Sequence, residues 1–239
     1  MGEFFKNKPT NTEIGKRTRL PYKYINALGC GKSNLTKVYI YCMITGTKNN
    51  SISYDMMAQI GGCNRDTIQN GVKYLVSKRY ISVRFKGDSR NSQSSVYGVN
   101  ETANIDWNLI SKINLNPKYG SENSKSFGLY FYLRAKDNTH KRGNDYVYIN
   151  KKFINMYRLQ LHILQEYQLI DIYYHKQEEV VILTFPQERV YEFISPESFD
   201  AIDIGLTEKI KKRIEAEDMR VNNGSNLEQV GRHGKREQV

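Results

Sequence analysis

Apolar residues recur at helical spacing in three stretches near the start of the chain. The first stretch has members at i, i+3, i+4, i+7 and i+8, namely Leu35, Val38, Tyr39, Cys42 and Met43. Its helix is expected to be capped by Ser33 or Asn34. A second helix is expected after the cap Ser53, with three side chains facing inward, Met56, Met57 and Ile60. The third stretch places Ile68, Val72 and Leu75 at i, i+4 and i+7.

Strand-like alternation follows the third helix. Residues 80–86 alternate between apolar and polar side chains, residues 87–94 form a polar loop, and residues 95–99 form a second strand-like run. These periods predict a three-helix bundle followed by a β-hairpin over residues 34–100.

The turn between the second and third helices carries the most specific signal in the chain. Ala58 is small where two helices must touch, Gly62 can adopt the left-handed conformation, and Asn64 is a good N-cap. Residues 57–68 resemble the helix-turn-helix of bacterial DNA-binding proteins, with the pattern apolar-Ala-x-x-x-Gly-x-(Ser/Asn)-Arg-x-Thr-(Val/Ile). Together with the hairpin, the resemblance implies a winged helix in which residues 87–94 are the wing. An ordinary helical hairpin in a core is the alternative.

The resemblance also implies which residues contact DNA, because the second helix of this motif presents its first turns to base edges. The expected contacts from this helix and its cap are Asn64, Arg65, Asp66, Thr67, Gln69, Asn70 and Lys73. Further basic contacts are expected from the helix end, the wing and the turn before the first helix, namely Lys78, Arg84, Lys86, Arg90 and Lys32.

Positive charge is concentrated in the same part of the chain. The formal net charge is +11, and residues 1–100 hold 16 basic and 5 acidic residues, whereas residues 101–239 hold 20 of each. A clustered positive charge is expected of a surface that binds phosphates, so double-stranded DNA is the expected partner. A charge that served only solubility would not need to lie in one half.

The apolar pattern recurs at an offset of 89 residues. The corresponding positions are Val38 and Phe127, Tyr41 and Tyr130, Ile44 and Leu133, Leu75 and Leu164, Ile81 and Ile170, and Val83 and Ile172. We therefore predict an α+β fold of two tandem winged-helix units, in which residues 126–185 form the second and divergent one.

The second unit lacks the Gly-x-(Ser/Asn)-Arg turn, and its hairpin carries Glu178 and Glu179, which are unfavourable near phosphate. Whether it touches DNA stays open, and its candidate backbone contacts are Lys151, Lys152 and Arg158. Tyr130 and Tyr132 are expected on an exposed helix face, where aromatic residues favour an interface. We therefore expect a homodimer.

The flanking segments are simpler. Residues 1–33 are expected to be a basic N-terminal arm, and residues 101–125 an Asn- and Ser-rich linker. Residues 186–239 are expected to contain an acidic segment, a charged helix over 208–221 and a disordered tail.

Patterns of catalytic or metal-binding residues are not found. The four histidines are scattered, and the three cysteines have no CxxC spacing, which is typical of a reduced intracellular protein. Gly29 to Ser33 resembles the end of a phosphate-binding loop, but Asn26 stands where that motif needs a glycine. We expect no enzyme activity and no cofactor.

The longest apolar run has seven residues, 38–44, so we expect a cytoplasmic protein that associates with the nucleoid through DNA.

The tandem arrangement resembles replication initiators of plasmids and phages, and also bacterial regulators. This resemblance implies a sequence-specific DNA-binding protein in replication initiation or transcriptional control of a mobile element, with replication or transcription proteins as further partners. The familiar initiators rely strongly on their C-terminal unit for DNA, whereas the basic unit here is N-terminal. The alternatives are an architectural or segregation protein, and an adaptor that binds a replisome protein through its winged helices.

Overall fold

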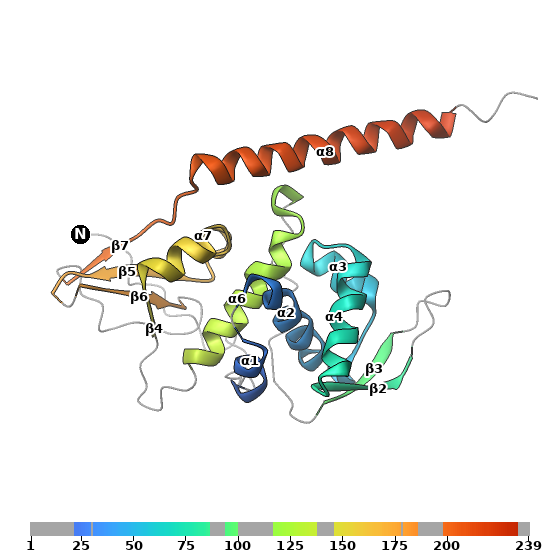
Figure 1. Cartoon of the computed structure of the whole chain (residues 1–239), viewed down its shortest axis with the longest axis horizontal. Coiled ribbons are helices and arrows are strands. Elements are labelled where there is room, and N and C mark those ends of the chain that lie inside the picture. The colour runs from blue at the N-terminus through green and yellow to red at the C-terminus, as the bar shows by residue number, and fades with distance from the viewer. Residues whose placement is uncertain are drawn as a thin grey trace, which may run out of the picture. The chain divides into compact units, whose positions relative to one another are not determined.

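The computed structural model has an α+β architecture (Figure 1). It describes residues 22–29, 31–86, 94–99, 117–137, 146–177, 179–185 and 198–233. These residues contain seven α-helices and two small antiparallel sheets. The chain divides into two compact units, residues 1–204 and residues 205–239. In the second unit the described structure is helix α8, Glu208–His233.

The first half of unit 1 contains a helical group and a three-stranded sheet. Its helices are α1 (Tyr22–Leu28), α2 (Lys32–Gly46), α3 (Tyr54–Gly61) and α4 (Arg65–Ser77), with a 3-10 turn η1 (Lys48–Asn50). Its strands are β1 (Ser51–Ile52), β2 (Ile81–Phe85) and β3 (Ser95–Val99). The strand order is β1-β3-β2, so the short strand between α2 and α3 pairs with the second strand of the hairpin.

The second half of unit 1 repeats this order of elements. Its helices are η3 (Pro117–Tyr119), α6 (Glu122–Asp137) and α7 (Lys151–Glu166), and its strands are β4 (Tyr146–Ile149), β5 (Asp171–His175), β6 (Val180–Thr184) and β7 (Phe199–Ala201). The strand order is β4-β6-β5-β7. The strand between the two helices again pairs with the second strand of a hairpin, and β7 is an addition.

Backbone hydrogen bonds repeat at the offset of 89 that the apolar pattern predicts. At the end of α4, the N–H of Arg79 donates to the carbonyl of Val76 at 2.9 Å, and at the end of α7 the N–H of Gln168 donates to Gln165 at 2.8 Å. Arg79 and Gln168 both adopt a left-handed conformation, with φ of 59° and 55°. The same turn therefore joins a helix to a strand in both halves.

The two halves differ between the middle strand and this turn. In the first half, α3 and α4 are separate helices within residues 54–77. In the second half, α7 alone spans residues 151–166 and is interrupted only by a kink at Tyr157, where φ is −113° and ψ is 20°. The helix starts are equivalent, because the side chains of Ser53 and Asn150 each accept a hydrogen bond from a backbone N–H three residues later. The second half therefore lacks a turn between two helices at this point.

Helices α2 and α6 form the centre of unit 1. Both are buried on almost all sides, and all residues from Val38 to Thr45 are buried. The helices approach closely at Gly128, where an added Cβ would overlap the carbonyl group of Leu35. One hydrophobic core therefore runs through both halves.

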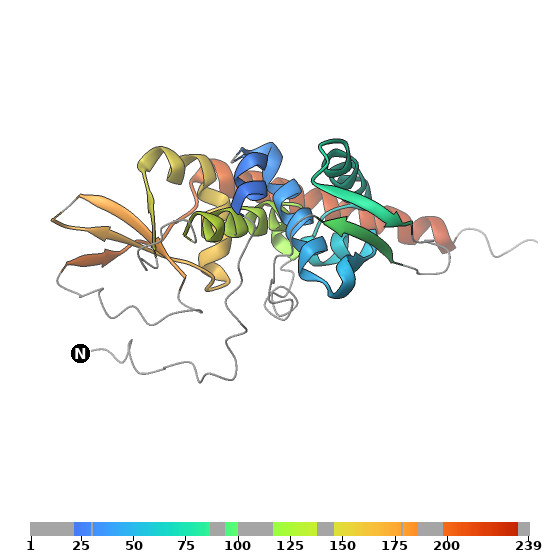
Figure 2. The ribbon, with the colours of Figure 1, turned by 90° about the horizontal axis from the view of Figure 1, so that it is seen from below.

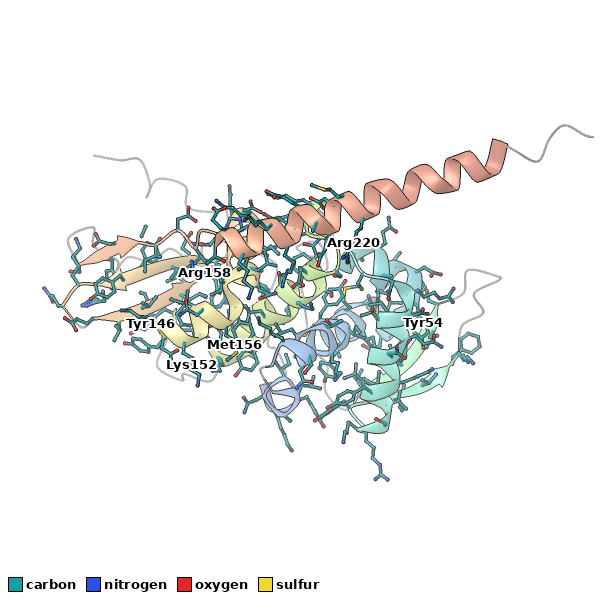
Figure 3. All side chains as sticks on the ribbon, turned by 45° about the horizontal axis from the view of Figure 1, so that its top comes forward. Tyr54, Tyr146, Lys152, Met156, Arg158 and Arg220 are labelled. Atoms are coloured by element: carbon teal, nitrogen blue, oxygen red, sulfur yellow. The ribbon has the colours of Figure 1, made fainter. Side chains whose placement is uncertain are left out.

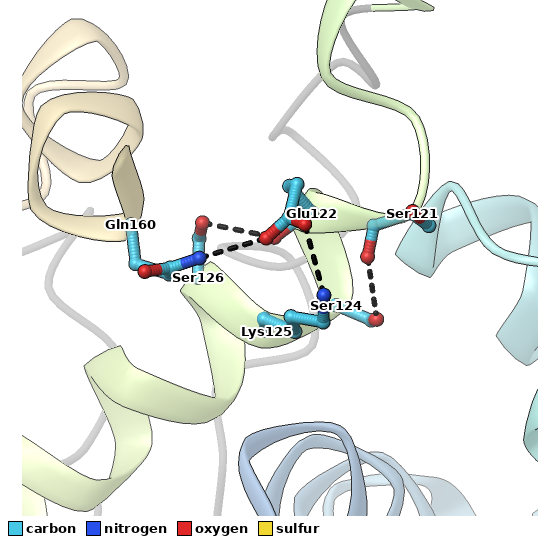
Figure 4. A network of polar contacts seen from close by, with 6 residues as sticks. All are labelled: Ser121, Glu122, Ser124, Lys125, Ser126 and Gln160. Atoms are coloured by element: carbon cyan, nitrogen blue, oxygen red, sulfur yellow. Dashed lines mark hydrogen bonds and ion pairs between the residues drawn. The ribbon is translucent and has the colours of Figure 1, made fainter. Parts of the chain in front are cut away.

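A polar network fixes the start of α6 against α7 (Figure 4). The buried carboxylate of Glu122 accepts hydrogen bonds from the Gln160 side chain at 2.7 Å and from the Lys125 ammonium group at 2.9 Å. The hydroxyl of Ser126 donates to the backbone carbonyl of Glu122 at 3.0 Å. The buried charge of Glu122 is thereby paired and hydrogen-bonded, as burial of a carboxylate requires.

Several expectations about helix boundaries are wrong. The first helix begins at Lys32, and its N-cap is Gly31, which makes no side-chain capping bond. The arm predicted to extend to residue 33 contains α1, which is anchored by the buried side chains of Ile25 and Leu28. Ile25 and Leu28 are only one helical turn apart, and one turn of apolar spacing in a basic segment is too short a pattern to predict a helix.

The later boundaries also differ. Helix α6 begins at Glu122, inside the predicted 101–125 linker, because its polar first turn is buried rather than exposed. Tyr130 and Tyr132 are buried in α6, which removes them as an exposed aromatic face. Helix α8 continues beyond residue 221 to His233. The predicted wing tip and most of the linker lie outside the described residues.

We expect Gly128→Ala to lower the free energy of unfolding by about 1–3 kcal/mol, the usual cost of overpacking. The backbone of Leu35 cannot move aside as a flexible side chain would. Urea denaturation of the full chain measures the change. Gly205→Ala is the matched control, because no atom lies within 4 Å of its added Cβ. Equal stability of both variants and the wild type would contradict the close approach of α2 and α6.

Candidate nucleic-acid interface

The turn between α3 and α4 has the predicted backbone geometry. Gly62 ends α3 with φ of 58° and ψ of 33°, the left-handed conformation that glycine adopts without steric cost. The adjacent N–H of Cys63 donates to the carbonyl of Ala58 at 3.1 Å. An added Cβ on Gly62 would lie 2.5 Å from the carbonyl oxygen of Gly120. The turn therefore needs glycine both for its own conformation and for its contact with the segment before α6.

The partly exposed cysteine of this turn also contacts the second half. Burial raises the pKa of the Cys63 thiol, and the nearby Ser124 side chain of α6 opposes this shift. The hydroxyl of Tyr39 donates to the backbone carbonyl of Met57 at 3.1 Å and holds the middle of α3 on α2. The position of the turn thus depends on both α2 and α6.

The N-cap of α4 is built by two of the predicted site residues. Asn64 Oδ1 accepts the backbone N–H of Thr67 at 2.8 Å and its hydroxyl at 2.6 Å. The Asn64 amide oxygen and the Thr67 N–H and hydroxyl are thus used within the cap. In the structure, Asn64 and Thr67 therefore fix the start of α4.

The outward face of α4 is polar and exposed. The buried side consists of Ile68, Gly71, Val72 and Leu75, as the apolar stripe predicts. The exposed side carries Arg65, Asp66, Gln69, Asn70 and Lys73, and it continues to Val76 and Ser77 at the end of the helix. Residues three and four apart on a helix are neighbours, so Asp66, Gln69, Asn70 and Lys73 form one continuous surface.

Arg65 is held at the edge of this surface. Its Nε lies 3.5 Å from a carboxylate oxygen of Asp55 in the first turn of α3, and both side chains are more than half exposed. An exposed ion pair of this kind is weak. It orients the guanidinium group at little cost, and a phosphate could displace Asp55.

Tight packing fixes α4 on α2. An added Cβ on Gly71 would overlap the Ile40 side chain. On the same side, the ammonium group of Lys37 lies 3.9 Å from the ring centre of Tyr74. The helix is therefore held rigidly while its polar face stays in solvent.

The β2–β3 hairpin extends from the end of α4 (Figures 1 and 2). Arg84 and Lys86 are exposed on and directly after β2. The Arg84 side chain crosses Gly98, since its Nε would lie 2.9 Å from an added Cβ there. Lys78 is exposed at the end of α4, and Lys32 is exposed at the start of α2. Arg90 lies outside the described residues.

An exposed aromatic residue at the hairpin was missed by sequence reasoning. A register shift lies between Val83 and Phe85, so Phe85 pairs with Val96 and not with Ser95. Phe85 is 52% exposed between Arg84 and Lys86. Simple alternation would put Phe85 on the same face as Ile81, and no residue in the strand marks the bulge. The expectation that Met56 faces inward is also wrong, because its side chain is 49% exposed on the outer side of the short helix α3.

Neither a metal site nor a membrane-spanning helix is found in the described part of the chain. No group of three or more His, Cys, Asp and Glu side chains there could hold a metal ion. None of the described helices combines the length and apolar character needed to cross a membrane.

Comparison of the chain with protein-family models, curated proteins and solved structures gives no match. The function is therefore argued from the geometry of this surface.

We expect Asn64→Ala to lower the free energy of unfolding by about 1 kcal/mol, as for loss of an N-cap. Asn64→Ser should retain most of that stability because serine also caps. Urea denaturation of the full chain checks both variants. Asn150→Ala is the matched change at the start of α7, whose cap accepts from Phe153 at 2.9 Å. Unchanged stability of Asn64→Ala would show that the cap does not hold α4.

Proposed function

We propose that the chain binds double-stranded DNA sequence-specifically through α4, within a fold of two tandem winged-helix units. The observation that carries the proposal is the exposed face of α4, which presents Gln69, Asn70 and Lys73 directly after a glycine turn. Amide side chains of this kind can make two hydrogen bonds to adenine, and lysine can contact guanine or a phosphate.

The arrangement of strands supports the fold assignment. In both halves the strand between the helices joins the hairpin at its second strand. In the first half the hairpin also follows the proposed reading helix, as a wing does. Its basic residues Arg84 and Lys86 would meet the phosphate backbone on one side of the groove. The excess of positive charge within residues 1–100 agrees with this role.

Phe85 adds an apolar group to the wing. An exposed aromatic ring between two basic residues resembles the apolar wedges that proteins insert from the minor groove. The bulge before Phe85 turns this ring to the same face as Val96. Its role is contact with sugars or bases, while Arg84 and Lys86 contact phosphates.

For the biological process, the proposal is replication initiation or transcriptional control of a mobile element, based on the tandem arrangement. An architectural or segregation protein would bind many sequences with similar affinity, and an adaptor would not bind DNA at moderate salt. Genome-wide footprinting separates these classes: directly repeated sites favour an initiator, and a palindrome in a promoter favours a regulator. Sedimentation of the full chain tests the expected homodimer.

We expect Gln69→Ala and Asn70→Ala to relax base preference, each at a cost of about 1–3 kcal/mol on the preferred site. Lys73→Ala should weaken preferred and random duplexes alike. Fluorescence anisotropy at fixed salt, on a duplex selected from a random pool, measures these effects.

Two exposed residues of other elements provide matched controls for these variants. Gln177→Ala, in the turn after β5, removes an amide, and Lys209→Ala, in α8, removes a lysine. If the α4 variants behave like these controls, α4 does not read the DNA.

We expect the affinity of the full chain for duplex DNA to fall steeply with salt. About six phosphate contacts from the basic residues would give a slope of log K against log salt on the order of −5. The double variant Arg84→Ala/Lys86→Ala should make that slope less negative by about 2. A titration from low to moderate salt measures both slopes. A flat response of the wild type would exclude phosphate contacts as the source of affinity.

A further inference from the structure

The second half of unit 1 carries an aromatic pair on its outer surface. In β4, Val147 and Ile149 are buried, whereas Tyr146 and Tyr148 point to the other face of the sheet. The two tyrosine rings are perpendicular with centroids 5.2 Å apart, and their hydroxyl oxygens are 3.2 Å apart. Tyr148 is 54% exposed. Because β4 is an edge strand of the sheet, a ligand can approach the pair from the side as well as from the face.

Two lysines follow the tyrosine pair closely in the sequence. Ile149 is the last residue of β4, Asn150 caps α7, and Lys151 and Lys152 are exposed in the first turn of the helix. In Figure 3 the side chains of Tyr146, Lys152 and Met156 lie along the same border of the structure. The partial positive charge of the helix start adds to that of the two ammonium groups.

This surface is chemically different from the face of α4. Helix α4 follows a separate helix, α3, and a glycine turn. Helix α7 has neither directly before it, so its exposed face is not positioned in the way that the face of α4 is. An exposed tyrosine ring, followed within four residues by two exposed lysines, suits a different ligand, an unpaired nucleic-acid strand, whose bases stack on the ring while the lysines contact its phosphates. In a duplex the base faces are covered by their neighbours and cannot stack in this way.

Charge argues against a protein as the main partner. Aromatic residues are also enriched at protein interfaces, but lysine is depleted there. Two adjacent exposed lysines beside a tyrosine pair therefore fit phosphates better than a protein surface.

We propose that Tyr146, Tyr148, Lys151 and Lys152 form a binding site for single-stranded DNA. This function goes beyond the proposed duplex binding by α4 and uses a different part of unit 1. A protein with both sites holds duplex DNA through its first half and an unpaired strand through its second half.

The test measures binding of the full chain to labelled oligothymidylate, which has no stable secondary structure, by fluorescence anisotropy. We expect Tyr148→Ala and Tyr148→Leu to weaken binding roughly 5- to 100-fold through loss of stacking on one base. Tyr148→Phe keeps the ring and should bind like the wild type. Because Tyr148 is exposed, the variants should have the same midpoint of urea unfolding as the wild type.

The lysines are tested by the double variant Lys151→Ala/Lys152→Ala. It should make the slope of log K against log salt less negative by about 1.4, as for two contacts to a single strand. Lys209→Ala/Lys212→Ala in α8 removes the same charge from another exposed position and is the matched control. Equal losses in the two double variants would overturn the site, because binding would then follow net charge alone.

The two DNA sites are separated by measuring every variant on both ligands. Asn70→Ala should keep its affinity for oligothymidylate, and Tyr148→Ala should keep its affinity for the selected duplex. The proposal is overturned if the wild type does not bind oligothymidylate, if Tyr148→Ala binds it as the wild type does, or if Tyr148→Ala loses duplex binding to the same extent. Failure of the duplex proposal alone would leave oligothymidylate binding sensitive to Tyr148.

Discussion

The close contact of α2 with α6 is the constraint on which the rest of unit 1 depends. At Gly128 the α6 backbone meets the carbonyl group of Leu35, and only glycine permits this approach. The buried surfaces of both helices then form one core, onto which the remaining helices and the sheets pack. Each half is therefore part of the other's folding unit, although the two halves repeat in sequence. A fragment that ended between them would expose one side of α2.

The same contact connects the proposed DNA-binding surface to the second half. The turn before α4 touches the segment before α6 through Gly62 and Gly120, and Gly62 also lies close to the Asn123 side chain at the start of α6. The start of α6 is held on α7 by Glu122 and its partners. A continuous set of contacts thus leads from the turn before α4 to α7, where the proposed single-strand site begins. The two proposed sites share no residue.

Repetition followed by divergence explains how one chain can carry two different surfaces. Both halves keep the helix-to-strand turn, with Arg79 and Gln168 in the same left-handed conformation. The first half retains a separate helix whose polar face is free in solvent. In the second half, the single helix α7 has only a kink at Tyr157, and the strand before it carries Tyr146 and the exposed Tyr148 on its outer face. The proposed functions differ because the two halves differ between the strand that joins the hairpin and the helix-to-strand turn.

The sequence by itself determined the local features that depend on one residue type or one period. The left-handed Gly62, the Asn64 cap, the buried stripe of α4 and the 89-residue offset follow from steric freedom, hydrogen bonding and helical periodicity. Tertiary structure decided what depends on distant partners. The polar start of α6 can be buried because Gln160, 38 residues away in the sequence, donates to the Glu122 carboxylate, and the register in which Phe85 pairs with Val96 depends on the partner strand. No local pattern contains those partners, so neither feature was predictable from the residues nearby.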